Sequence, residues 1–161
     1  MHIHPDPFRL ATRVAVVCSL ALALPWAAAV DRGTAPAGAK YLSGGIGLDE
    51  QADLRQELSG YTLWLTTAAR GSGEYLASVK LRISEAASGQ LVLVHTMAGP
   101  WFFAALPAGR YQVEATASRG AELAPLTQRL TVSVGGGGAP QQHVIEFAGM
   151  PPAGPGPVQP R

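Results

Sequence analysis

The sequence has little sulfur, little charge and few aromatic side chains. Its 161 residues include one cysteine, Cys18, and only 14% of them are charged. A single thiol cannot form an intramolecular disulfide or a cysteine-ligated metal cluster. The formal net charge of +1 provides no excess of basic residues for nucleic acid, whose binding depends on neutralising phosphates. The composition therefore predicts no nucleic-acid partner and gives no indication of a cofactor.

Glycine and proline, by contrast, are plentiful. The chain contains 19 Gly and 13 Pro, spread along its whole length. Such a turn-rich composition is typical of a small β domain with loose ends rather than of a helical bundle.

The first 29 residues have the organisation of a secretory signal peptide. Arg9 and Arg13 precede an apolar run over residues 14–29, which is broken by Pro25 and ends in small residues. The alternative is a membrane anchor, but a spanning helix needs about 20 apolar residues. We therefore predict cleavage near Ala29, a periplasmic or secreted location, and no stable membrane span after cleavage.

Cleavage there would leave a formally neutral chain without a thiol. Residues 1–29 contain two of the 12 basic residues, one of the 11 acidic residues and Cys18. The residues before Cys18 do not resemble a lipid-attachment motif. Ten basic and ten acidic residues would remain, so overall charge gives no reason to expect binding to a membrane surface or a polyanion.

The remaining chain divides into three parts. Residues 30–40 are small and polar and predict a flexible leader. Residues 149–161 are so rich in proline and glycine that they predict a disordered tail. Residues 41–148 are expected to form one domain.

A short helix is expected near the start of this domain. Residues 48–58 follow the glycine-rich segment 43–47, with Asp49 as a candidate N-cap and Gly60 placed to end the helix. A glycine-rich loop before a helix can bind phosphate. Here no Lys-Ser/Thr pair closes the loop, so the phosphate-loop motif is not met.

After the helix the apolar period changes to two, which indicates strands. Residues 79–84 alternate most clearly, with Val79, Leu81 and Ile83 on one face and Lys80 on the other. About seven short strands follow one another, so we predict an all-β fold, a seven-stranded antiparallel sandwich with a short N-terminal helix. The expected core is Val79, Leu81, Ile83, Trp101, Phe103, Leu106, Tyr111 and Val113.

A tight corner is expected between the two strands of residues 99–117. Leu106 ends the first strand, Pro107 fixes φ, and Gly109 is expected to adopt the left-handed conformation. Tyr111 then begins the inward alternation of the second strand. We expect substitution of Gly109 by valine to cost about 1–3 kcal/mol through backbone strain.

The residues around this corner resemble a known family, the carboxypeptidase regulatory-like domains, also called transthyretin-like or prealbumin-like. The pattern that carries the resemblance is Gly99-x-Trp101-x-Phe103-x-x-Leu106-Pro107-x-Gly109-x-Tyr111-x-Val113. The resemblance covers about residues 75–120 and implies a seven-stranded Greek-key sandwich that is an accessory module without an active site of its own. The segments before it also resemble the start of small exported proteobacterial proteins.

Two activities of related proteins are not supported. The zinc domain that accompanies such modules in carboxypeptidases has no counterpart here. A related branch hydrolyses 5-hydroxyisourate with a C-terminal Tyr-Arg-Gly-Ser motif, whereas this chain ends in "GPVQPR". No serine lies in a nucleophile-elbow pattern, so we predict that the protein is not an enzyme.

Two binding hypotheses remain. Trp64 and Phe102 are predicted to face away from the core and could form a contact patch, unless the N-terminal segment and the helix cover them. His95 and Met97 share one strand face, and thioether sulfur suits Cu(I). The sequence therefore favours a non-enzymatic exported module that contacts another protein or an envelope component, with periplasmic copper binding as the alternative.

Overall fold

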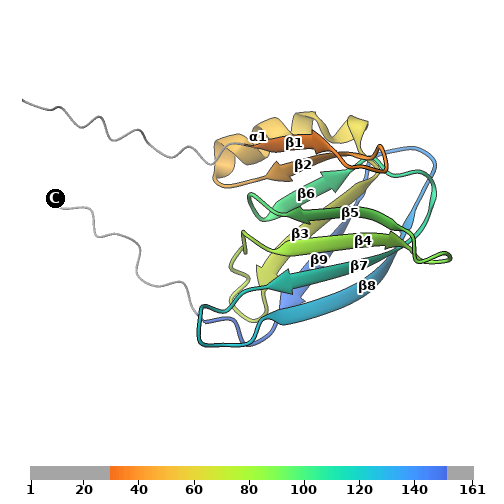
Figure 1. The fold of residues 1–161 in the computed structure, drawn as a ribbon. Coiled ribbons are helices and arrows are strands. Elements are labelled where there is room, and N and C mark those ends of the chain that lie inside the picture. Colours follow the sequence, from red (N-terminus) through yellow and green to blue (C-terminus); the bar gives the residue numbers. More distant parts are fainter. Residues whose placement is uncertain (1–29, 152–161) are drawn as a thin grey trace, which may run out of the picture.

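A computed structural model describes residues 30–151, which form two stacked β-sheets and one α-helix (Figure 1). The predicted signal peptide lies outside the described residues, as does most of the predicted tail. The expected β-sandwich with a short N-terminal helix is confirmed. No helix within residues 30–151 is long and apolar enough to cross a bilayer.

The two sheets contain five and four strands. Sheet A has the order β1 (Asp31–Thr34), β2 (Lys40–Gly44), β6 (Trp101–Ala104), β3 (Leu63–Ala69) and β9 (Gln141–Phe147). Sheet B has the order β5 (Leu91–Thr96), β4 (Lys80–Glu85), β7 (Gly109–Ala117) and β8 (Leu126–Val134). Every pairing of these strands is antiparallel except that of β3 with β9, which is parallel, so the prediction of a wholly antiparallel sandwich is wrong at this edge of sheet A.

The structure contains all seven predicted strands, as β3 to β9, and adds two. β1 and β2 come from residues 30–44, and β1 lies within the segment predicted to be a flexible leader. A tight turn joins them, in which the amide of Ala35 donates to the carbonyl of Ala39 at 2.8 Å. Gly33 leaves room for the ring of Tyr41, which a side chain there would overlap. The leader is therefore part of sheet A, stabilised by pairing that its composition does not reveal.

Helix α1 (Leu48–Gln56) begins where expected but is not capped as expected. Its N-cap is Gly47, which makes no side-chain cap, and not Asp49. Glu50 and Gln51 instead reach back to Gly45: the Gly45 amide donates to Glu50 Oε1 at 2.6 Å, and Gln51 Nε2 donates to the Gly45 carbonyl at 2.9 Å. A short 3₁₀ turn (Leu58–Gly60) follows the helix. The first turn of the helix is thus bound to the glycine-rich loop before it.

The apolar side chains form two clusters, one on each face of sheet A. The main core lies between the sheets and includes the predicted Val79, Leu81, Ile83, Leu106, Tyr111 and Val113. A second cluster lies on the outer face of sheet A, where Leu54 of α1 meets Leu42, Trp101 and Phe103. Sheet A is therefore covered on both faces.

The predicted orientation of β6 is wrong. Phe102 is fully buried in the main core, whereas Trp101 and Phe103 point to the outer cluster under α1. Alternation correctly separates these side chains onto two faces. It cannot tell which face meets the other sheet, because β6 is a central strand of sheet A with large aromatics on both sides.

The corner after β6 exists, but Gly109 does not act as predicted. The Tyr111 hydroxyl donates to the Pro107 carbonyl at 2.9 Å, and the Leu106 amide donates to Thr62 Oγ1 at 2.8 Å. Gly109 does not have a positive φ, and a Cβ there would lie 3.6 Å from the Tyr111 ring, an ordinary contact. The expected strain at Gly109 is therefore absent, and hydrogen bonds hold the corner.

Candidate binding surface

The two predicted contact aromatics lie in different surroundings. Trp64 is half-buried, with its ring centroid 5.2 Å from that of Trp101 and 5.5 Å from that of Phe103. Arg55 of α1 places its guanidinium carbon 4.7 Å from the Trp101 ring centroid, over the same cluster. Phe102 has no exposed surface and cannot contact a partner. The rings nearest to Trp64 belong to the buried side chains Trp101 and Phe103. A contact role for Trp64 stays a prediction.

The two predicted copper ligands are packed rather than open. The His95 ring lies 4.6 Å from that of Tyr41 and 5.6 Å from that of Phe102, and its side chain is 11% exposed. Met97 is buried in the main core. Within residues 30–151 no group of three His, Cys, Asp or Glu side chains could hold a metal ion. The copper hypothesis therefore gains no support from the geometry.

His95 has one charged neighbour. Its Nε2 is buried and makes no hydrogen bond to the described residues, because Asp31 Oδ2, at 3.5 Å, lies beyond a well-formed bond. Burial lowers the pKa of His95 below its ordinary value, and the nearby Asp31 carboxylate opposes that change only in part. The neutral imidazole is therefore favoured in the folded protein.

The outer face of sheet B carries the exposed, mostly polar side chains that alternate with the buried ones along its strands; we name it the open face. Its residues lie in cross-strand rows fixed by the register of β5, β4, β7 and β8. One row is Val94, Arg82, Glu114 and Arg129; the next is Thr96, Lys80, Thr116 and Thr127. On the other side lie Leu91, Ser84, Gln112 and Thr131, followed by Arg110 and Ser133.

The charges of the open face are strongly unequal. Four basic residues share it with one acidic residue, Glu114. The Arg129 Nε donates to Glu114 Oε2 at 2.7 Å, across neighbouring strands. A small hollow of about 60 Å³ lies among the side chains Arg82, Ser84, Gln112, Glu114 and Arg129. The face is therefore cationic, with hydroxyl and amide groups between its charges.

Four other acidic side chains lie close together around α1. Asp49, Glu50 and Asp53 lie on α1 and Glu57 follows it, on the side of the molecule that covers sheet A. Glu57 is paired with Arg32 of β1. Arg32, Lys40 and Arg55 lie on that side as well, so its charges are mixed, whereas those of the open face are mostly positive.

Sequence reasoning missed this surface, although one signal was present. Lys80 and Arg82 alternate with the buried Leu81 and Ile83, which predicts their outward direction. Their neighbours Arg110 and Arg129 come from strands separated by long stretches of chain, and only the strand register brings the cations together. The net charge of the whole chain does not reveal that these four cations share one face.

Comparisons with known proteins place the chain in no family: no family model, curated protein or solved structure matches it. A proposal for the function of the protein therefore depends on the chemistry of its own surfaces.

Proposed function

We propose that the protein is a non-enzymatic exported accessory domain that binds another protein or an envelope component through the open face of sheet B. The observation that supports this proposal is that four basic residues share that face with one acidic residue, although the total formal charge of the chain is only +1. An antiparallel sheet commonly has one solvated face. A solvated face with charges of mostly one sign is electrostatically suited to an oppositely charged partner.

The sequence resemblance supports the same class of function. Carboxypeptidase regulatory-like domains are accessory modules, and the resemblance implies Greek-key connections for the seven strands β3 to β9. It also agrees with the export predicted from residues 1–29. We also propose that the chain belongs to this family, that strands β3 to β9 have Greek-key topology, and that the protein is periplasmic or secreted.

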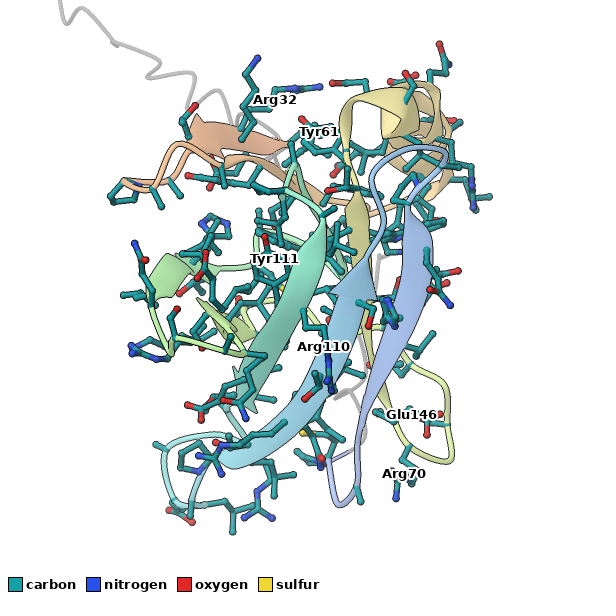
Figure 2. The ribbon with its side chains drawn as sticks, turned by 90° about the vertical axis from the view of Figure 1, so that its right-hand side faces the viewer. Arg32, Tyr61, Arg70, Arg110, Tyr111 and Glu146 are labelled. Atoms are coloured by element: carbon teal, nitrogen blue, oxygen red, sulfur yellow. The ribbon has the colours of Figure 1, made fainter. Side chains whose placement is uncertain are left out.

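Capture from envelope extracts tests this function. The bait is the protein recovered after export, whose intact mass also reports whether residues 1–29 have been removed. The Lys80→Gln/Arg82→Gln variant removes two charges from the open face. The Arg32→Gln/Lys40→Gln variant removes two charges from β1 and β2 of sheet A, and Figure 2 shows Arg32 well apart from Arg110 of β7.

We expect an envelope component to be retained by the wild-type protein and by the sheet A variant, and to be lost with the open-face variant. Retention by all three baits would show that the open face is not the binding surface. Recovery of an uncleaved chain in the cytoplasm would contradict export.

A further inference from the structure

We infer that the open face binds an acidic polysaccharide, a sugar chain that carries carboxylates at intervals. This inference rests on the proposed function and names the ligand class of the same surface. Its starting point is the spacing of the cations, which are distributed over three of the four strands of sheet B rather than gathered at one point. They are Lys80 and Arg82 on β4, Arg110 on β7 and Arg129 on β8.

The spacing favours a ligand with repeated charges. Neighbouring strands lie about 4.8 Å apart, so the backbones of β4 and β8, on either side of β7, are separated by about 10 Å. Lys80 and Arg82 are two residues apart on one strand face, which corresponds to about 7 Å. A single phosphate or carboxylate cannot reach several positions separated in this way, whereas a polymer with anions along its length can.

The neutral groups between the cations match sugar hydroxyls. Hydroxyl side chains both donate and accept hydrogen bonds, as sugar hydroxyls do, and an amide offers both functions. Thr116 and Thr127 already bond to each other at 2.9 Å across the strands. The face carries further groups of this kind in Ser84, Thr96, Gln112, Thr131 and Ser133.

Glu114 fits this arrangement despite its negative charge. It accepts a hydrogen bond from Arg129 Nε, which fixes the guanidinium on the sheet. A guanidinium has five N–H donors, so the terminal nitrogens of Arg129 remain chemically able to donate to a ligand carboxylate. The acid therefore orients one cation rather than cancelling the whole surface.

Other polyanionic partners fit less well. Exposed aliphatic side chains on the open face are limited to Leu91 and Val94, on the edge strand β5, and no aromatic side chain lies in its rows. Membrane-surface binding uses inserted apolar and aromatic side chains, and single-stranded nucleic acid stacks on aromatics. Protein hot spots are enriched in Trp and Tyr as well as Arg. A polymer of charged and hydroxylated sugars uses what this face offers.

The test measures binding of the exported, full-length protein to polygalacturonate by calorimetry at low and moderate salt. Dextran, a neutral glucan, serves as the uncharged control ligand. We expect saturable binding to the polyuronate that weakens as salt rises, and no binding to dextran. Lys80→Gln/Arg82→Gln is expected to weaken binding at least tenfold, and Arg32→Gln/Lys40→Gln less than twofold.

All substituted side chains are exposed, and thermal melts establish that each variant folds. If the first open-face variant fails to fold, Arg110→Gln/Arg129→Gln tests the same surface from β7 and β8. Absence of polyuronate binding at low salt would overturn the inference, as would equal losses in the open-face and sheet A variants. Tighter binding to single-stranded DNA, to anionic phospholipid vesicles or to an acidic protein would also overturn it.

The two proposals fail in distinguishable ways. If the polyuronate does not bind but capture of an envelope component still requires Lys80 and Arg82, the ligand class is wrong and the binding function stands. If capture does not depend on the open face either, both proposals are wrong.

Discussion

The outer faces of the two sheets are opposite in character. The outer face of sheet A carries Trp64, Trp101 and Phe103 and lies under α1, whereas the open face of sheet B carries charged and hydroxyl side chains. Both faces obey the same alternation along their strands. The difference arises from what occupies the outward positions. Aromatics require a cover, which Leu54 of α1 provides together with Val30, Leu58 and Tyr61, while cations and hydroxyls are well solvated by water.

The covered face also requires close backbone approach. Gly45, with φ of 93°, lies under the Trp101 ring, and a Cβ there would be 2.9 Å from a ring atom. A Cβ on Gly99 would overlap the Gly44 carbonyl. No comparable restriction is seen at Gly109, at the start of β7 in sheet B. Substitutions on the two faces should therefore differ greatly in their cost.

Trp101→Ala should produce the largest effect. It removes a fully packed aromatic from the covered face, and we expect the free energy of unfolding to fall by about 3–5 kcal/mol. Urea denaturation measures the change. Thr131→Ala on the open face is the control, with an expected change within about 0.5 kcal/mol. A loss below about 1 kcal/mol for Trp101→Ala would mean that the outer cluster contributes little to stability.

Gly99→Ala should have an intermediate effect. The added methyl overlaps the backbone of Gly44, which must shift, and overpacking of this kind costs about 1–3 kcal/mol. Gly109→Ala is the matched control, because it meets only an ordinary contact and should change stability by less than about 1 kcal/mol. Parallel thermal melts compare the two. Similar melting temperatures for both variants would contradict the tight approach at Gly99.

Acidification should destabilise the protein through His95. Its pKa is lowered in the folded state, so the unfolded chain binds the proton more readily. The contribution of neutral His95 to the free energy of unfolding is thus fully present above its ordinary pKa of 6.5. It is lost as pH falls from there toward the lowered pKa of the folded state. Unfolding measured from pH 8 to pH 5 should show a smaller decline in His95→Phe, which keeps the ring stack.

His143 provides the comparison for this experiment. Burial lowers its pKa as well, so some decline should remain in His95→Phe. The His143→Gln variant should retain the part of the decline that belongs to His95. An unchanged pH profile in His95→Phe would assign the whole acid sensitivity to other groups.

Arg129→Gln should have the smallest effect on folding. It breaks an exposed ion pair with Glu114, and such pairs contribute about 0–1 kcal/mol. Urea unfolding at low and high salt measures that contribution, which should shrink as salt rises. A loss above about 2 kcal/mol would show that the open face contributes to stability as well as to the surface charge.

Much of the fold could be predicted where one side of a strand is apolar and the other polar. Leu81 and Ile83 alternate with Lys80 and Arg82, and both the strand and its inward side are confirmed. The prediction failed at β6, whose aromatics occur on both sides because both are buried. It failed again at β1, since a short polar strand depends on its partner β2 rather than on its own apolar pattern.

The candidate surface could be predicted only in part. The outward direction of Lys80 and Arg82 follows from alternation, but their proximity to Arg129 depends on β7 lying between β4 and β8. Similarly, the pairing of His95 with an aromatic stack depends on β2 and β6, which belong to the other sheet. Contacts made across sheets require the topology, and alternation within one strand does not contain it.

The parallel pairing of β3 with β9 has a consequence for how the chain folds. Leu63 pairs with Gln141, so the pairing of β3 with β9 can form only after the last strand of the described chain has been synthesised. Sheet A also needs β6, from the middle of the sequence, between β2 and β3. Such distant pairings predict slow folding, on the order of milliseconds to seconds for β-sandwiches, which stopped-flow refolding would measure. A chain synthesised only as far as β8 lacks the strand that completes sheet A, so the complete fold can form only after β9 has been made.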